Sequence, residues 1–446
     1  MNQLALHSGS KHARDSSAYF KHSMRLNSTL RSTSRSRDHH RAPSHNGVMA
    51  RLLIECTRTA GSGLHTGIQR VVRRIIAEAQ SLLPRAGFEE VLPVVINQGR
   101  ISALAQLAPH PREVDRAAAS SPPTVRAEPL NISADDHLLL IDASWHIDAW
   151  PALKHAMSQG ASLHVVWHDL IPLQYPAFFP EGLTERFRHH LDQVLQHAHS
   201  IHCVSHTVRA QLTEYIRKTA PDRMHSIELG MQHPGADGLR SGQAPRESLR
   251  VAFDGMVDAS GTHPTLSLLA VGTLEPRKGH ALLLDVCEAI WRDPKAPSSI
   301  RLIIAGAPGW RVDSLLARLA QHPELGRRLF VFHDLSDAEL DWCYRHASCL
   351  VYPSLAEGYG LPIAEAGWRG LPVLLSDTPI HREVAGPRAR YFAPQSAAAL
   401  EASLRQLQSG ALRWDARWPE PGRFRRWRDT TAGLIDGLRQ RSYEEG

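Results

Sequence analysis

The stretch that most constrains the fold of this chain is residues 350–365. It reads LVYPSLAEGYGLPIAE, in which an apolar run ends at Pro353 and a loop with Gly358 and Gly360 follows. Pro362 then stands where a helix would begin, because the fixed φ of proline suits the first turn of a helix and its missing N–H is not needed there. The stretch therefore predicts a buried strand, a glycine loop and the N-terminal end of a helix.

Two glutamates flank this loop, Glu357 before it and Glu365 inside the predicted helix. Free backbone N–H groups at a helix N-terminus attract an anion, typically phosphate. Carboxylates repel phosphate but accept hydrogen bonds from sugar hydroxyls. A nucleotide sugar carries phosphates for the helix N-terminus and hydroxyls for the two glutamates. The alternative interpretation is a structural turn with two surface glutamates.

The setting of these glutamates, PS-x-x-EG-x-G-LP-x-x-E, resembles the E-x7-E motif of retaining glycosyltransferases with the GT-B fold. The greatest resemblance is to the large group-one family (glycosyltransferase family four), which includes many bacterial mannosyltransferases. It covers roughly residues 50–410 and is most specific in the second half of the chain. It implies an α/β protein of two Rossmann-like, doubly wound parallel-sheet domains that face each other across a cleft.

The composition narrows the functional classes. The 446 residues carry a net charge of +6, but residues 1–48 hold eight basic and two acidic residues, which leaves 43 of each sign elsewhere. The folded part is therefore neutral overall, and nucleic-acid binding loses its compositional support. No apolar run approaches the ~18 residues of a membrane-spanning helix. The five cysteines form no C-x-x-C pair, as expected of reduced thiols in the cytoplasm.

Strand-like and helix-like segments alternate from about residue 50, which indicates parallel sheets. Residues 1–48 lack the apolar core of a secretory signal and are expected to be a disordered basic tail, or alternatively an Arg/Ser-rich targeting or acidic-surface-binding arm. Met49 is a candidate start. With the resemblance, we expect an acceptor-side domain at 49–238, a linker at 239–263, a nucleotide-sugar-binding domain at 264–420, and a terminal helix at 421–446 that crosses back to the first domain.

A predicted helix after the first strand has a clear apolar stripe formed by Ile68, Val71, Val72, Ile75 and Ile76. The arginines of this segment, Arg70, Arg73 and Arg74, lie largely off the stripe. We therefore expect a solvent-exposed basic face, with contact to a membrane surface or an acidic acceptor as the alternative.

The loop TLEPRKG, residues 273–279, follows a predicted strand of the second domain. Open α/β sheets bind ligands at the carboxyl ends of their strands. By resemblance, Arg277 and Lys278 bind the donor diphosphate and neutralise the charge that grows on the leaving nucleotide. The resemblance implies that no metal is needed, and the chain contains no D-x-D motif.

By resemblance, Glu357 contacts hydroxyls of the transferred sugar and Glu365 contacts the ribose. Ser354 either binds phosphate or caps the turn, and the residues after Glu357 offer backbone N–H groups to the sugar and phosphate. The donor-binding set implied by the family is Gly67, Thr273, Arg277, Lys278, Ser354, Glu357, Gly358, Tyr359, Gly360, Leu361 and Glu365.

In the first domain, His168 and Asp169 follow the apolar run LHVVW and resemble the HD motif of the family. That likeness implies that His168 hydrogen-bonds the sugar or leaving phosphate and that Asp169 orients it. A core histidine beside a helix-capping aspartate is the alternative. The glycines before residue 68 nearly match a dinucleotide motif, while the family implies instead that Gly67 approaches the donor phosphate or the acceptor.

Six histidines between residues 189 and 206 raise the question of a metal site. They are spread over a helix, a strand and the start of the next helix, so we expect structural or surface roles for them and no metal. The residues are His189, His190, His197, His199, His202 and His206.

The resemblance as a whole implies a cytoplasmic, metal-independent, retaining hexosyltransferase without a cofactor beyond its nucleotide sugar. It is greatest to bacterial polysaccharide mannosyltransferases and suggests GDP-mannose, while UDP-glucose and dTDP-rhamnose stay open. The implied acceptor is a glycan or lipid-linked glycan of surface polysaccharide or lipopolysaccharide synthesis, at the inner face of the cytoplasmic membrane. The alternative of another class is a non-catalytic protein that binds nucleotide sugars.

Overall fold

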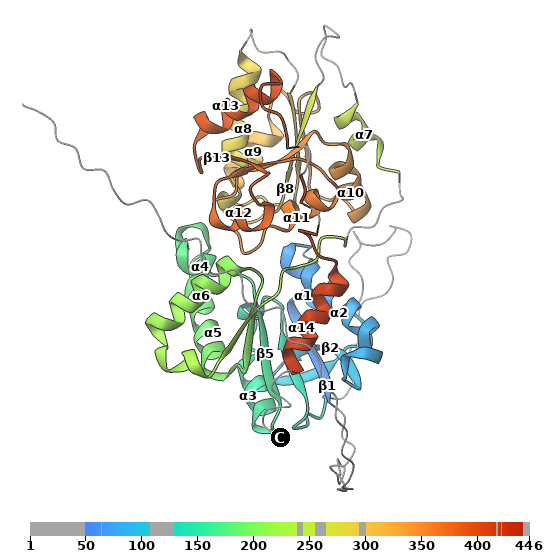
Figure 1. Ribbon diagram of the computed structural model, residues 1–446, viewed down its shortest axis with the longest axis vertical. Helices are drawn as coiled ribbons and strands as arrows, with labels where there is room; N and C mark the ends of the chain where they lie inside the picture. The colour runs from blue at the N-terminus through green and yellow to red at the C-terminus, as the bar shows by residue number, and fades with distance from the viewer. Residues whose placement is uncertain are drawn as a thin grey trace, which may run out of the picture. The chain divides into compact units, whose positions relative to one another are not determined.

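The computed structural model describes residues 50–63, 65–107, 129–238, 244–254, 265–293, 300–415, 418–420 and 422–439. These residues build two parallel-sheet α/β domains, each with helices packed on its sheet (Figure 1). The predicted tail at 1–48 and the candidate start Met49 lie outside the described residues.

The first domain contains a sheet of seven strands in the order β3-β2-β1-β4-β5-β6-β7. All neighbouring pairs are parallel except β2 and β3, which are antiparallel. The sequence patterns predicted each strand except the short β3. The strands are β1 (Arg51–Glu55), β2 (Glu90–Asn97), β3 (Arg100–Ala103), β4 (His137–Leu140), β5 (Ser162–Trp167), β6 (Ser200–Cys203) and β7 (Glu228–Met231).

The helices of this domain follow the strands that they connect. The longest is α2, which begins at Gly67 after a capping box in which Thr66 and Gln69 satisfy each other's backbone N–H groups. The α-helices are α1 (Thr57–Gly61), α2 (Gly67–Ala86), α3 (Trp150–Ser158), α4 (Ile171–Gln174), α5 (Leu183–His197) and α6 (His206–Thr219).

The second domain has a six-stranded, wholly parallel sheet in the order β10-β9-β8-β11-β12-β13. Its strands agree with the predicted apolar runs. They are β8 (Leu266–Val271), β9 (Ile300–Ala305), β10 (Leu329–Phe332), β11 (Cys349–Tyr352), β12 (Val373–Ser376) and β13 (Arg390–Phe392).

Its helices are α8 (His280–Arg292), α9 (Asp313–Ala320), α10 (Asp337–His346), α11 (Leu361–Trp368), α12 (Pro379–Ala385) and α13 (Ala397–Gln408). A capping box of Ser336 and Glu339 opens α10. The predicted linker also contains a helix, α7 (Glu247–Phe253), which is fixed to the second domain by the bidentate ion pair of Arg246 with Glu339.

Each sheet has one point where the strand order reverses. In the first sheet it lies between β1 and β4, and in the second between β8 and β11. We call the carboxyl ends of these two strand pairs the first and the second switch point. Ligands of open α/β sheets bind at such points, because the connections on either side turn away and leave a crevice.

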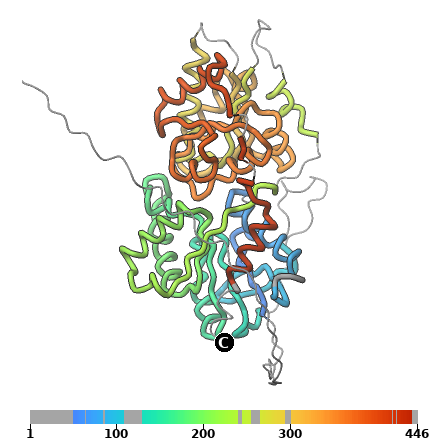
Figure 2. Tube along the Cα trace, viewed as in Figure 1, coloured from blue at the N-terminus to red at the C-terminus, as the bar shows by residue number. Residues whose placement is uncertain are grey.

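The last helix, α14 (Trp427–Arg439), lies beside α2, with which it shares the core of the first domain (Figure 2). Its start is fixed by a hydrogen bond from Trp427 N to Asp237 Oδ1 of 2.8 Å, and Thr430 Oγ1 donates to the carbonyl of His233 at 2.8 Å. The chain thus returns from the second domain to the first.

The five cysteines are buried free thiols. Among the described residues, none of the helices combines the length and the apolar character that crossing a membrane requires.

Candidate active site

The loops after β8 and β11 meet at the second switch point, because these two strands are neighbours in the sheet. Gly279, with a φ of +71°, lies close to Pro353, the first residue of the loop after β11. A Cβ added to Gly279 would lie 2.6 Å from the carbonyl oxygen of Pro353. A side chain here would separate the loops. Strand order, rather than local sequence, therefore brings the basic loop and the glycine loop together.

Glu357 is the centre of a buried ion cluster at this point. Its carboxylate accepts hydrogen bonds from Lys278 Nζ at 2.7 and 2.9 Å, from Arg277 Nη1 at 3.1 Å and from the hydroxyl of Tyr352 at 2.9 Å. The sequence analysis assigned the two cations to the diphosphate and the glutamate to the sugar, and these assignments stay predictions. The structure shows that both cations contact Glu357 directly.

The electrostatics of this cluster follow from burial and pairing. Burial alone would raise the pKa of Glu357, but Lys278 and Arg277 outweigh it and hold that pKa well below its usual range. Burial lowers the pKa of Lys278, and Glu357 opposes this shift. Arg277 also pairs with the buried carboxylate of Glu275 at 2.9 Å, so the cluster holds two cations and two carboxylates in a site shielded from water, where charges act strongly on one another.

Ser354 supports the cluster from the glycine loop. Its hydroxyl is fully buried and donates to Glu357, so in this structure it positions the carboxylate. Thr273 follows Gly272, the first residue after β8, whose φ of +143° favours glycine. An added Cβ at Gly272 would meet the side chain of Lys278 at 3.8 Å, so this turn lies beside the cluster.

The glycine loop ends at Gly360, whose φ of +91° is a left-handed conformation that glycine adopts without strain. Helix α11 then begins at Leu361 with proline in its first turn, as predicted. An added Cβ on Gly67, the first residue of α2, would lie 3.6 Å from Leu361 Cδ1. The N-terminal ends of two helices, one from each domain, therefore lie side by side.

Glu365 lies buried in α11, and both of its carboxylate oxygens accept hydrogen bonds. Tyr344 donates its hydroxyl to Oε2 at 2.9 Å, and Arg70 forms an ion pair with Oε1. The expectation of a solvent-exposed arginine face on α2 is wrong for Arg70, because its guanidinium reaches across to the second domain. Arg74 also pairs across, with Asp337 at 3.4 Å.

His168 and Asp169 follow β5 and contact the glycine loop. The backbone of Gly358 packs so closely on them that an added Cβ would lie 2.0 Å from the His168 carbonyl oxygen. His168 Nε2 lies 2.7 Å from the carbonyl oxygen of Ile141. Because a carbonyl only accepts, Nε2 carries the proton and Nδ1 is left as an acceptor. Burial lowers the pKa of His168, which keeps the ring neutral at pH 7.

The sequence left two roles open for Asp169, a helix-capping aspartate and a residue of the donor site, and the structure shows features of each. Its Oδ1 accepts from the backbone N–H of Ile171 at 2.9 Å, as a helix-capping aspartate does. Burial raises its pKa, while the nearby charge of Arg277 opposes that shift. It therefore holds the first backbone N–H of α4 and also lies within electrostatic reach of the ion cluster.

Tyr359 is the loop residue that joins the second switch point to the first domain. Its buried ring lies 5.4 Å from the ring of His233, and the neighbouring carbonyl of Gly358 accepts from Ser205 Oγ at 2.8 Å. Both partners belong to the first domain. The glycine loop is thereby fixed from two sides.

Sequence reasoning missed two carboxylates at the first switch point. Glu55 ends β1 and accepts from Ser144 Oγ at 2.5 Å and from Thr57 N at 2.7 Å, while Asp142 follows β4 and accepts from Thr59 N at 2.6 Å. Burial, then the charge of Asp142, raises the pKa of Glu55 to about 7. A polar residue at the end of an otherwise apolar strand was the available signal.

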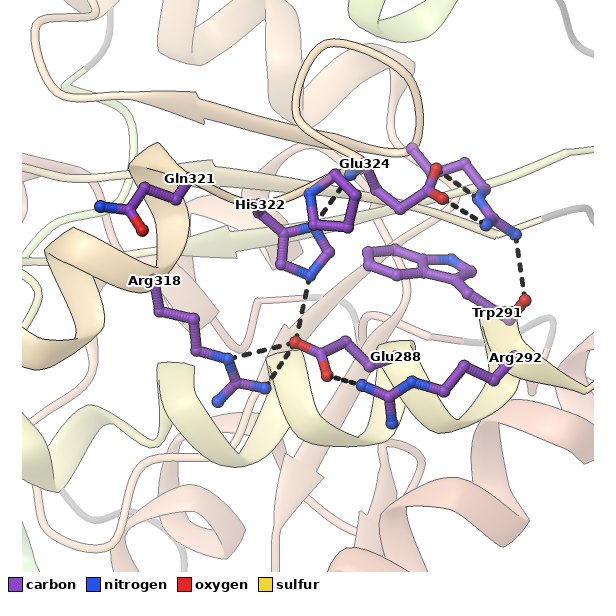
Figure 3. A pocket seen from close by; sticks show the side chains of 9 residues that line it. Glu288, Trp291, Arg292, Arg318, Gln321, His322 and Glu324 are labelled. Carbon is purple, nitrogen blue, oxygen red and sulfur yellow. Dashed lines mark hydrogen bonds and ion pairs between the residues drawn. The ribbon is translucent and has the colours of Figure 1, made fainter.

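Two cavities accompany these features. One of about 540 Å³ lies at the carboxyl end of the first sheet, where Thr57, Asn97, Gln98 and Asp148 contribute polar atoms. The other, of about 370 Å³, lies between α8 and α9 (Figure 3). There Arg318, Arg292 and His322 surround Glu288, so this second cavity is lined by charges that neutralise one another.

Residues 262–418 match the family model described as glycosyl transferases group 1. The chain is 32% identical over 356 residues to the serotype-specific mannosyltransferase WbdA of Escherichia coli, which covers 78% of this chain and 41% of that protein. Residues 262–418 therefore belong to the group 1 glycosyltransferases. The chain spans about two fifths of the length of the WbdA proteins that it matches.

Further comparisons agree with this family. The O-antigen chain mannosyltransferase B of Escherichia coli is 27% identical over 262 residues, 58% of this chain and 64% of that one. Among solved structures, sucrose-phosphate synthase from Thermosynechococcus elongatus (17% identity, 87% and 94% coverage) and Anabaena Alr3699/HepE in complex with UDP and glucose (14%, 89% and 99%) both superpose with a TM-score of 0.53. The two-domain architecture is therefore the GT-B fold.

Proposed function

We propose that this chain transfers mannose from GDP-mannose to a growing surface polysaccharide, with retention of anomeric configuration and without a metal. The buried cluster of Lys278, Arg277 and Glu357 at the second switch point is the observation that carries the proposal. It combines two fixed cations for a diphosphate with one carboxylate for sugar hydroxyls. The mannosyltransferase relatives support the choice of sugar.

The two helix N-termini near Gly67 and Leu361 would bind the diphosphate together with Arg277 and Lys278. Backbone N–H groups and fixed cations stabilise the negative charge that develops on the leaving GDP, because they need no reorganisation during the reaction. The same cations take the part that a metal ion plays in other glycosyltransferases. Turnover should therefore persist in EDTA.

On this proposal Glu357 binds hydroxyls of mannose, and Glu365 binds the ribose. Because Arg70 and Tyr344 occupy Glu365 in this structure, the ribose hydroxyls would share or replace the contact of Arg70. His168 presents an acceptor nitrogen, Nδ1, beside the glycine loop, and this nitrogen would accept a hydrogen bond from a donor-sugar hydroxyl.

The acceptor would bind at the first domain. The cavity of about 540 Å³ at the carboxyl end of its sheet has the amide side chains and carboxylate that bind sugar hydroxyls. A glycan, free or lipid-linked, fits this chemistry. The acceptor hydroxyl would then attack from the side that the GDP leaves, and the departing phosphate would take its proton.

The direct test is to incubate the purified chain with GDP-mannose and a mannan oligosaccharide acceptor. We expect GDP release, an elongated product with the α-anomeric linkage of the donor, and the same rate in EDTA. UDP-glucose and dTDP-rhamnose should give far slower release. An inverted product or a strict Mg²⁺ requirement would contradict the proposed mechanism. Faster transfer from UDP-glucose or dTDP-rhamnose would contradict the proposed donor. Tight binding of a nucleotide sugar without any turnover would show a non-catalytic protein.

A further inference from the structure

A cluster outside the proposed transfer site has metal-binding chemistry. His206, His233 and Glu383 each offer one ligand atom, and these atoms all lie within 4.8 Å of one another; among the described residues they form the one group with this property. His206 is the only one of the six histidines of 189–206 that takes part. The closest pair, His233 Nε2 and Glu383 Oε1, is 2.9 Å apart.

The three residues come from separate parts of the fold. His206 opens α6 and His233 follows β7, both in the first domain, whereas Glu383 lies in α12 of the second domain. The rings of His206 and His233 meet edge to face, with centroids 5.7 Å apart. A ligand bound here would therefore connect the two domains.

The carboxylate of Glu383 is held by donors that a metal ion would not displace. Oε1 accepts from His206 N at 2.7 Å, and Oε2 accepts from Thr207 N at 2.8 Å and Thr207 Oγ1 at 2.6 Å. Such second-shell hydrogen bonds orient the ligands of protein metal sites.

His233 is oriented as well. Its ring packs against Tyr359, and its carbonyl accepts from Thr430. His206 is exposed to solvent, so its ring can rotate towards the other two ligands and leave a coordination position open to water. Two imidazoles, one carboxylate and one water form a donor set that Zn²⁺ commonly takes, at distances of about 2.0–2.2 Å.

We propose that His206, His233 and Glu383 bind a single Zn²⁺ ion, which joins the two domains beside the glycine loop. In the bound state the ion replaces the hydrogen bond between His233 and Glu383, and the remaining hydrogen bonds to Glu383 persist. The site is separate from the cluster of Lys278, Arg277 and Glu357. The proposal therefore stands or falls independently of the transfer reaction.

The test is calorimetric titration of the EDTA-treated, dialysed full-length chain with ZnCl₂. The parent should show one tight site, and His206→Asn should weaken it at least about tenfold. His225→Asn is the matched control, because His225 is exposed in the same domain but lies outside the cluster. This control removes one of the 27 histidines and should leave the tight site intact.

A second measurement does not depend on heat signals. Binding to the folded state alone raises the thermal midpoint, so ZnCl₂ should raise the midpoints of the parent and of His225→Asn by more than those of His206→Asn and Glu383→Gln. MgCl₂ should have no such effect, because Mg²⁺ prefers oxygen ligands. If the parent shows no tight site, or if both histidine variants bind Zn²⁺ alike, the proposal is overturned and the cluster is a hydrogen-bonded contact only. His206→Asn decides the matter even if Glu383→Gln does not fold.

Discussion

The two switch points have the same topology and different charge. At the second, Lys278 and Arg277 surround Glu357 and Arg277 also pairs with Glu275, so these ion pairs contain two cations and two carboxylates. At the first, two carboxylates, Glu55 and Asp142, lie together, and burial and their mutual repulsion raise the pKa of Glu55. One fold thus provides one switch point of paired opposite charges and another of two neighbouring carboxylates.

The largest expected effect is on the second switch point. If Glu357 binds the reacting sugar as proposed, Glu357→Gln should lower the turnover of GDP-mannose by about 10³-fold, because the sugar loses a charged hydrogen-bond acceptor. GDP binding, measured by calorimetry, should stay within about threefold of the parent, because GDP lacks that sugar.

Glu288→Gln is the control for this change, since Glu288 is also a carboxylate paired with arginines but lies in the cavity between α8 and α9. It should leave turnover unchanged. A comparable loss of GDP affinity in Glu357→Gln would assign Glu357 to the nucleotide instead, and the contrast between the two switch points would weaken.

The next effect concerns the connection between the two regions. Arg70→Ala leaves Glu365 buried without its cation, and breaking a buried ion pair in this way costs about 3 kcal/mol. The thermal midpoint of Arg70→Ala should therefore lie clearly below that of the parent. Arg250→Ala, which removes an exposed pair with Glu247 on α7, should change it little. Equal midpoints for both variants would show that the Arg70 contact adds nothing.

A smaller effect is expected for His168, which joins the first domain to the glycine loop. His168→Ala should lower turnover by ~10²-fold if Nδ1 accepts a hydrogen bond from the reacting sugar. His164→Ala removes a buried histidine of β5, the strand that precedes His168, where it bonds Ser200, and it should affect stability rather than turnover. Similar turnover in the two variants would limit His168 to packing.

The smallest effect is a pH dependence at the first switch point. An unfolded glutamate loses its proton near pH 4.5, whereas folded Glu55 keeps it to about pH 7. Between pH 4.5 and 7 the folded state keeps a proton on Glu55 that the unfolded state has lost. Protonation of Glu55 therefore stabilises the fold at low pH, and this stabilisation is lost as the pH rises from 4.5 to 7. Glu55→Gln should lack this loss.

The comparison is made by urea unfolding of both proteins at about pH 5 and about pH 8. The stability of Glu55→Gln relative to the parent should be higher by ~1–3 kcal/mol at the upper pH. A constant difference would mean that Glu55 titrates normally, and the electrostatic contrast between the switch points would be smaller than the structure indicates.

Local patterns were sufficient to predict most of the fold. Apolar runs indicated the strands, and Gly358, Gly360 and Pro362 indicated the loop and helix of the second switch point. They could not show that Lys278 contacts Glu357 or that Arg70 pairs with Glu365, because residues 79 and 295 positions apart meet only once the strand order and the packing of two domains are set. The short β3 and α7 were missed because their sequences lack a clear periodicity.

The return of α14 to the first domain has a consequence for synthesis on the ribosome. Helix α2 buries part of its apolar face against α14, yet about 340 residues separate the two elements along the chain. The second domain can fold completely while the first still waits for its last helix. A nascent chain therefore exposes the apolar surface of α2 until translation passes residue 439, and this surface is where a chaperone would bind and where premature release would lead to aggregation.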